Sequence, residues 1–434
     1  MLVGGEPGSW GPMVAGGKRL RLLRRIAVTV AVLGLVGVTA VTTTGMLLVQ
    51  QAESSLTRVP VQQLDVAPQL TDARHFLVVG SDARDGLDRE QREGLSLGSF
   101  DGQRSDVVLY IAISADRSTV SLVSLPRDLL VLDDGRQRKL TDVYAGGPDR
   151  LVRVVQENFG LPVNHFAEIS LGGFIEVVRT LGGVEICLEE PLRDRKAGAD
   201  FDAGCHEMSA EDSLAYVRSR QGARADFERI DRQQTFLRAV LRELTQRRVF
   251  YDVPRLFRLV DEVASNVTTD EHLGVAQMRG LADEMREVIQ GGVPMSTVPA
   301  YPRRIDGVAF MVAYGPGARA MFEDLRAGRP LADPGTREER ADTRVAVWAS
   351  GRWTGADVVV STLSFGGFLA GGAGNGPAAL DVGSTTTVYR LPDDDGAADR
   401  VAAVLGAPIE PLPEGVSAPS GADAVVVVGD DAIS

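Results

Sequence analysis

The sequence is poor in the residues that bind soft metals, and it has no excess of positive charge. Its 434 residues include only two cysteines and four histidines. None of these has the spacing of zinc ligands, which argues against a histidine or thiolate zinc site. The 46 lysines and arginines are outnumbered by 59 aspartates and glutamates, so the formal net charge is -13. This argues against a general affinity for nucleic acid or anionic lipid, and any anion site must be local.

One charge-free segment is long enough to cross a membrane. Residues 26–49 carry no charged side chain, and a helix of this length spans a bilayer with some tilt. Five basic residues precede it, namely Lys18, Arg19, Arg21, Arg24 and Arg25. The positive-inside tendency then predicts a cytoplasmic tail over 1–25, a transmembrane helix over 26–49, an extracellular stalk over 50–72 and an extracellular remainder. A cleaved signal peptide is the alternative.

The predicted location affects how the two cysteines are interpreted. Cys187 and Cys205 lie eighteen residues apart, and in an oxidising compartment they can close one loop. Such a bridge typically adds about 2 to 4 kcal/mol of stability. Two unrelated buried thiols are the alternative.

Beyond the stalk, strand-like and helix-like segments alternate. Apolar, β-rich runs occur at 74–80, 105–113 and 118–125, and helical periodicity is clear in segments such as 227–247. The chain exceeds the usual size of one domain, so at least two folded units are expected. We predict an α/β fold over 73–328 with helices packed on a central β-sheet, a linker over 329–342 and a small α/β domain over 343–434.

Charged side chains stand at the ends of three predicted strands. Pro126 ends one apolar run because it lacks a backbone donor, and Arg127 and Asp128 follow it directly. The other two strand ends carry the same residue types, namely Asp82 with Arg84 and Arg104 with Asp106. Open α/β sheets bind ligands at such an edge.

A second polar group lies further along the chain. Arg218 and Arg220 point the same way only if the chain leaves its helix between them. Arg229, Arg232 and Gln233 fall at i, i+3 and i+4, hence on one helical face, with Asp226 as a candidate N-cap.

Together these side chains predict an anion site. Several arginine forks around one cavity repel one another unless a multiply charged ligand, such as a pyrophosphate, neutralises them. Two carboxylates in the same place worsen phosphate binding unless a hard cation bridges them to the phosphate oxygens. Asp82 and Asp106 are the candidates for holding Mg²⁺ (or Mn²⁺). Structural salt-bridge networks on a polar sheet edge are the alternative.

An ordered series of short motifs resembles a known family. The stretches FLVVGSDAR, RSDVVLYIAI, VSLPRDLLV, KLTDVYAGG, HFAEISLGGFIEVVRTLGGVEI, SLAYVRSRQ and ADFERIDRQQ follow, over 74–250, the pattern of LytR-CpsA-Psr proteins. The resemblance implies a mixed central β-sheet with helices on both faces, one transmembrane helix and an extracellular catalytic domain. Residues 343–430 look like a degenerate copy of the small LytR C-terminal domain.

The family resemblance implies a phosphotransferase. Its members move a glycopolymer from a polyprenyl-pyrophosphate carrier to a hydroxyl of peptidoglycan. The chain has no G-x-x-x-x-G-K-[ST] loop, so such a transfer takes its driving force from a bond already in the substrate. The partners implied are therefore the lipid-linked polymer, the peptidoglycan acceptor and the membrane, without nucleic acid.

The residues that match the family motifs receive roles from it. Asp82 and Asp106 are expected to hold the metal, together forming a catalytic group with Arg84, Arg104, Arg127 and Asp128. The expected pyrophosphate ligands are Arg104, Arg127, Lys139, Arg218, Arg220, Arg229, Arg232 and Gln233. A lipid tail needs an apolar tunnel, for which the candidates are Phe174, Ile175, Val178, Phe236 and Leu237. Ordinary core packing is the stronger explanation of these residues, because amphipathic helices on a sheet need such a face anyway.

Two other functions use the same features. A lipid-pyrophosphate hydrolase would employ the same arginines and Mg²⁺ with water as acceptor. A non-catalytic membrane-anchored regulator is the other alternative, but the cytoplasmic part of about 25 residues is too small for a DNA-reading fold.

Overall fold

The fold is described from a computed structural model of the chain. It describes residues 50, 53–54, 56–65, 73–81, 105–221, 225–246, 266–274, 277–278, 280–281, 288, 293–349, 353–377, 380 and 383–433. The chain divides into two compact units, Met1–Ser54 and Ser55–Ser434, and the fold below is that of the second. Within the described ranges no helix is both long and apolar enough to cross a membrane. The predicted transmembrane segment 26–49 lies outside those ranges.

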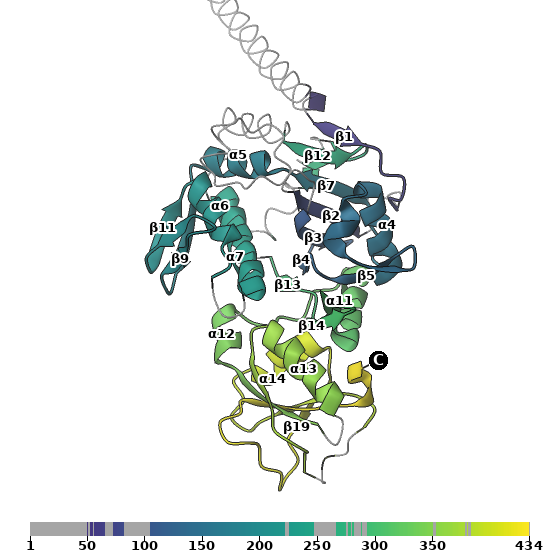
Figure 1. The fold of residues 1–434 in the computed structure, drawn as a ribbon, viewed down its shortest axis with the longest axis vertical. Coiled ribbons are helices and arrows are strands. Elements are labelled where there is room, and N and C mark those ends of the chain that lie inside the picture. Colours follow the sequence, from purple (N-terminus) through teal and green to yellow (C-terminus); the bar gives the residue numbers. More distant parts are fainter. Residues whose placement is uncertain are drawn as a thin grey trace, which may run out of the picture. The chain divides into compact units, whose positions relative to one another are not determined.

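A seven-stranded mixed sheet forms the centre of the larger domain (Figure 1). Its order is β1-β12-β7-β2-β3-β4-β13. The bounds are β1 Thr57–Val59, β2 Arg74–Ser81, β3 Ser105–Ile113, β4 Val120–Leu125, β7 His165–Ile169, β12 Val267–Asp270 and β13 Met295–Thr297. Strands β2, β3 and β4 are antiparallel neighbours, whereas β7 runs parallel to β2 and β13 parallel to β4. The predicted α/β class with a mixed sheet is confirmed.

Helices cover both faces of this sheet because apolar residues alternate along its strands. Leu77 and Val79 of β2 belong to the core that α3, α4 and α11 cover. Phe76 and Val78 belong to the opposite core, which includes Leu241 of α7. The bounds are α3 Leu140–Tyr144, α4 Pro148–Phe159, α5 Leu171–Leu181, α6 Ala210–Arg218, α7 Ala225–Gln246 and α11 Gly315–Ala327. Figure 1 shows α4 and α7 on either side of the strands.

A third core lies under α5, α6 and α7 beside short antiparallel strands. These are β8 Val184–Leu188 with β11 Gly204–Met208, and β9 Leu192–Asp194 with β10 Ala199–Phe201. The helix starts are locally encoded, since Ser170 caps α5 by accepting from the Gly173 N–H and Ser209 forms a capping box with Asp212 at α6.

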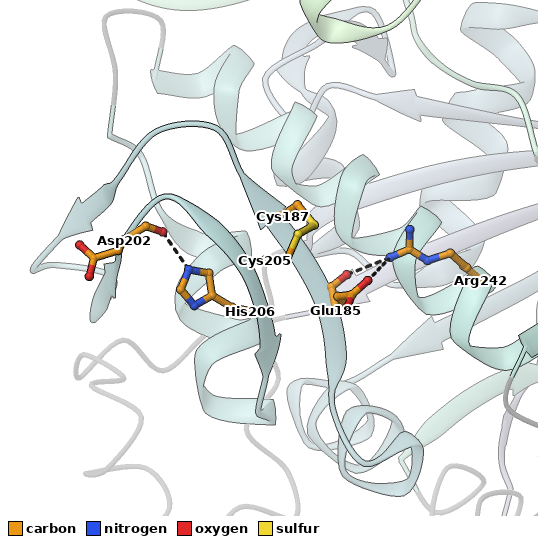
Figure 2. The surroundings of a disulfide bond; sticks show 6 residues. All are labelled: Glu185, Cys187, Asp202, Cys205, His206 and Arg242. Atoms are coloured by element: carbon orange, nitrogen blue, oxygen red, sulfur yellow. Dashed lines mark hydrogen bonds and ion pairs between the residues drawn. A yellow bond between two sulfur atoms is a disulfide. The ribbon is translucent and has the colours of Figure 1, made fainter.

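The predicted disulfide is present between β8 and β11. Cys187 and Cys205 face each other in the strand register and are bonded through sulfur. Figure 2 shows this bridge with Arg242 of α7 beside it. The Arg242 Nη2 donates to the Glu185 carbonyl at 3.1 Å, which ties the bridged strands to α7.

The segment expected to be a stalk contributes to the domain. Strand β1 pairs with β12, and the backbone N–H groups of Gln62 and Gln63 donate to Asp149 Oδ1 of α4 at 2.7 and 3.1 Å. Residues 56–65 are therefore part of the sheet domain rather than a free connector.

Asp270, at the end of β12, is fully buried and fastens this edge of the sheet. Its carboxylate accepts from the N–H groups of Phe166 and His272 at 2.9 and 2.8 Å, and lies 3.3 Å from His165 Nδ1. Burial alone would raise the pKa of Asp270, but the hydrogen bonds from His165, Phe166 and His272 outweigh it and lower this pKa.

The C-terminal residues form a second sheet of five strands, in the order β17-β16-β20-β18-β19. The bounds are β16 Arg344–Trp348, β17 Leu369–Gly372, β18 Thr387–Arg390, β19 Ile409–Pro411 and β20 Ala424–Val427, with helices α13 Trp353–Phe365 and α14 Ala397–Leu405 and a final 3-10 turn Asp430–Ile433. The predicted linker contains a short helix, α12 Arg337–Asp342.

The remaining described strands form two hairpins close to the main sheet. These are β5 Leu130–Asp133 with β6 Arg136–Lys139, and β14 Ala300–Ile305 with β15 Val308–Ala313. The first hairpin begins at Leu130, shortly after Arg127 and Asp128, and ends at Lys139. It therefore links three of the predicted site residues.

Candidate active site

Three strand ends meet at one edge of the main sheet, as the sequence predicts. Strand β2 ends at Ser81 opposite Ser105, where β3 begins, and β4 ends at Leu125 opposite Val108. The register slips between Gly80 and Ser81, so that Asp106 is the extra residue of a bulge. Bulges of this kind re-aim a side chain and are common beside active sites.

Several residues predicted for this edge lie outside the described part of the chain. Asp82, Arg84 and Arg104 lie outside the described residues, and so do the side chains of Asp106 and Asp226. Among the residues that are described, no group of three histidine, cysteine, aspartate or glutamate side chains is arranged to hold a metal. The predicted Mg²⁺ ligands therefore stay a prediction.

The turn after β4 holds Arg127 and Asp128 through their backbone atoms. The Leu129 N–H donates to the Pro126 carbonyl at 2.9 Å, which closes the turn. The Arg127 carbonyl accepts from Thr141 and the Asp128 carbonyl accepts from Met311, both at 2.9 Å. Because hydrogen bonds hold the backbone at both residues, the two side chains extend from a fixed backbone.

Two cations lie beside Asp128, and a third, Arg229, acts on it electrostatically. Its carboxylate lies 2.9 Å from Lys139 Nζ and 3.5 Å from Arg127 Nε. Burial alone would raise the pKa of Asp128, but Lys139, Arg127 and Arg229 together outweigh it and lower this pKa. Three cationic side chains thus act at one place in a chain that is acidic overall, and an anion site requires such a concentration of positive groups.

Arg218 and Arg220 occupy a turn that leaves its helix where the sequence predicts. Helix α6 ends at Arg218, and Ser219 has φ -58 and ψ 138, which is an extended conformation. Asp194 fixes the turn by accepting from the Arg220 N–H at 2.7 Å and from the Ser219 hydroxyl at 3.2 Å. Asp194 was not among the predicted residues, because it lies on β9, some 25 residues earlier, and no local pattern identifies it.

Arg229 and Arg232 of α7 are buried and Gln233 is half-buried, which agrees with their predicted common face. Arg232 Nη2 donates to the carbonyls of Ser219 and Gln221, at 3.1 Å each. This places the Arg232 guanidinium on the backbone that carries Arg218 and Arg220. Helix α7 begins at Ala225, so Asp226 lies in its first turn. The prediction of Asp226 as the N-cap is therefore wrong.

A cavity of about 30 Å³ lies between α7 and the sheet, with Gln233 and Gln234 among its lining residues. Its walls include Val107, Leu109, Leu122 and Leu237. Of the five residues predicted to contact a lipid tail, only Leu237 lines this pocket. The others, namely Phe174, Ile175, Val178 and Phe236, pack in the core under α5, where the Phe174 and Phe236 rings lie 4.9 Å apart.

Comparison with known proteins shows the family. The model of the LytR_cpsA_psr family matches residues 39–327, which is more than half of the chain, so the chain belongs to that family. Two relatives come from Corynebacterium glutamicum. One is named probable cell wall biosynthesis protein LcpB, with 33% identity over 279 residues, 63% of this chain and 66% of the relative. The other is named cell wall biosynthesis protein LcpA, with 27% identity over 325 residues, 65% of this chain and 61% of the relative. The chain thus spans less than two thirds of each.

A solved structure shows the same fold. A LytR-Csp2A-Psr enzyme from Actinomyces oris is 24% identical, with a TM-score of 0.51 over 62% of this chain and 96% of that chain. At this identity the likeness supports the α/β fold alone.

Proposed function

We propose that this protein transfers a glycopolymer from a polyprenyl-pyrophosphate carrier to a hydroxyl group of peptidoglycan. The observation that carries the proposal is the group of cationic side chains at the end of β4, where Arg127 and Lys139 lie within 3.5 Å of Asp128 and Arg229 also acts on it electrostatically. A pyrophosphate is a compact, multiply charged anion, and such a group of cations suits it.

The names of relatives support a reaction on cell-wall polymers. A Bacillus subtilis relative, 27% identical over 211 residues, is named polyisoprenyl-teichoic acid–peptidoglycan teichoic acid transferase TagU. It aligns with 48% of this chain and 64% of its own length. Together with the two corynebacterial relatives named for cell wall biosynthesis, it favours transfer of a polymer over a regulatory role.

In the proposed reaction the acceptor hydroxyl attacks the phosphorus that bears the polymer. A new P–O bond forms to the acceptor oxygen, the bond from that phosphorus to the bridging oxygen of the pyrophosphate breaks, and polyprenyl phosphate leaves with the bonding electrons. The acceptor proton passes to a base that the described residues do not identify. Phosphoryl transfer depends mainly on positioning and charge neutralisation, which arginines provide without a covalent enzyme intermediate.

The arginines and Lys139 have the roles of anion ligands in this proposal. Arg127, Lys139 and Arg229 bind one side of the pyrophosphate, while Arg218 and Arg220 bind it from the turn after α6. Arg104 is expected to join them. Arg232 then acts mainly on the position of that turn, because its guanidinium is bound to two backbone carbonyls.

Asp82 and Asp106 are proposed to hold Mg²⁺ or Mn²⁺. A pair of carboxylates suits a hard divalent cation. Ser81 and Ser105, which adjoin Asp82 and Asp106 in the chain, are paired at the bulge between β2 and β3. When bound, the ion would neutralise charge on the phosphate oxygens. Asp128 is a poor third ligand, since Lys139 already occupies it.

The proposal places the enzyme at the outer face of the cell membrane, anchored by residues 26–49. Alkaline phosphatase joined after residue 434 should then be active, because it folds only outside the cytoplasm. An inactive phosphatase, together with an active cytoplasmic reporter at the same junction, would reverse this topology.

The reaction is tested with purified full-length protein, a lipid-linked labelled glycan and peptidoglycan fragments. Arg127→Ala and Arg218→Ala should each lower transfer by about 10- to 100-fold, because a charge-assisted hydrogen bond contributes about 1.5 to 3 kcal/mol. Arg136→Ala is the matched control, since Arg136 is exposed at the far end of the hairpin that carries Lys139. Wild-type transfer in both test variants would refute this site. Release of free glycan with no transfer would identify a hydrolase instead.

A further inference from the structure

Helix α7 carries side chains of two kinds on opposite faces. Arg229, Arg232 and Gln233 lie on the face toward the candidate active site. Positions 231, 234 and 238 lie on the opposite face, because a residue advances by about 100° along a helix. The opposite face is fastened to β13, where Gln234 Nε2 donates to the Ser296 carbonyl and to Thr297 Oγ1 at 3.2 and 3.0 Å.

Asp231, on this second face, is bound by the linker helix α12. Its carboxylate lies 3.2 Å from Arg340 Nη2 and 3.6 Å from Arg337 Nε. Arg337 and Arg340 are three residues apart and hence on one helical face. The side chains of Asp231 and Arg340 are only 7% and 10% exposed, whereas that of Arg337 is 53% exposed. Arg340 is therefore the main partner of this carboxylate.

Arg340 is held at a defined position by α12 itself. A capping box between Thr336 and Glu339 starts the helix, and Arg340 Nη1 donates to the Gly335 carbonyl at 2.6 Å. The Thr343 N–H donates to the Glu339 carbonyl at 3.1 Å, and strand β16 follows directly. The arginine that binds Asp231 thus lies in the helix that leads directly into the first strand of the C-terminal sheet.

A second contact fixes the C-terminal domain against the family domain. Helix α11 and helix α14 approach so closely that a Cβ atom at Gly317 would lie 2.2 Å from the Val404 carbonyl oxygen. Tyr314, just before α11, is fully buried in the C-terminal core. Two separate anchors therefore connect the two domains, one at α11 and one at α7.

The charge on Asp231 depends on these arginines. Burial raises the pKa of Asp231, and Arg340, Arg337 and Arg238 only partly offset this effect, while Glu338 adds to it. A cavity of about 40 Å³, lined in part by Asp231, Gln234 and Arg340, adjoins the Asp231–Arg340 ion pair and has room for a few water molecules. Loss of Arg340 would leave a buried carboxylate beside this cavity without its main partner, which destabilises the packing of α7 against α12.

We propose that Arg340, through its ion pair with Asp231, is a positioning residue for the anion-binding face of α7. The C-terminal domain then takes part in binding the lipid pyrophosphate without touching it. This inference rests on the proposed function, because it treats Arg229 and Gln233 as ligands of the anion.

The test measures the affinity of full-length protein for geranylgeranyl pyrophosphate with Mg²⁺ by calorimetry. Arg340→Met and Asp231→Asn should each weaken binding about tenfold, and Arg340→Lys should restore part of the loss. The double variant should bind no more weakly than the weaker single variant, because the two residues act as a unit. Arg329→Met is the matched control, since Arg329 lies in the same linker, pairs with Asp324 of α11 and is 57% exposed.

The outcomes separate the two proposals. If the wild-type protein does not bind the probe, the proposed function fails and this inference fails with it. If the wild type binds and all three single variants at Arg340 and Asp231 stay within twofold of it, only the positioning role is overturned. Additive losses in the double variant would also overturn it. If Arg340→Met does not fold, the near-isosteric Asp231→Asn and the charge-preserving Arg340→Lys decide the question.

Discussion

Replacement of Arg232 by methionine tests whether this arginine binds ligand or positions the turn that carries Arg218 and Arg220. Its two hydrogen bonds to the Ser219 and Gln221 carbonyls are charge-assisted, and each contributes about 1.5 to 3 kcal/mol before offsets. Burial opposes the charged guanidinium and lowers the pKa of Arg232, so part of that gain is lost. We therefore expect Arg232→Met to lower the stability of this turn by about 1 to 3 kcal/mol, so that it opens more often.

Hydrogen exchange gives the direct measurement of that opening. The Arg220 N–H donates to Asp194, so we expect it to be protected from exchange in the wild type. A loss of this size predicts exchange at 219–221 that is faster by about 5- to 150-fold, with weaker binding of geranylgeranyl pyrophosphate. Arg232→Lys should recover little, since one ammonium does not reproduce the guanidinium fork.

The control for this experiment is Arg242→Met on the same helix. Arg242 is largely exposed and donates to the Glu185 carbonyl, away from the turn. Unchanged exchange at 219–221 combined with weaker binding in Arg232→Met would contradict the reasoning. Arg232 would then contact the ligand itself, as the sequence pattern predicts.

Three further changes test the scaffold around the site. Cys205→Ser, which opens the bridge to Cys187, should lower stability by about 2 to 4 kcal/mol, and a denaturation curve equal to that of the wild type would contradict this. Gly317→Ala should lower the melting temperature through its clash with a backbone carbonyl, whereas Gly280→Ala, at an exposed helical glycine with open space, should be neutral or slightly stabilising. Asp270 has a lowered pKa in the folded state, so its contribution is present above about pH 4 and is lost as the pH falls below that value. The melting temperature of Asp270→Asn should accordingly fall less steeply between pH 5 and pH 3 than that of the wild type, and parallel curves would rule out this assignment.

The sequence by itself determined the local features of this protein. Pro126 ends β4 because it has no backbone donor, and alternating apolar residues in β2 build the two sheet faces. The spacing of Arg218 and Arg220 predicts a chain that leaves its helix, and Ser219 is extended as expected. Such features depend on neighbours in the chain, so a short window contains the information.

Only the tertiary structure decided which distant groups meet. Asp194 fixes the Arg218 turn from another strand, and Arg232 lies on backbone carbonyls rather than on an open cavity. The main ion-pair partner of Asp231 is Arg340, which is 109 residues away in the chain. Hydrogen bonds and ion pairs act over a few ångströms of space, and no periodicity along the chain encodes them. The partners of a buried charge therefore follow from the packing of α7, α12 and β9, which the sequence pattern leaves open.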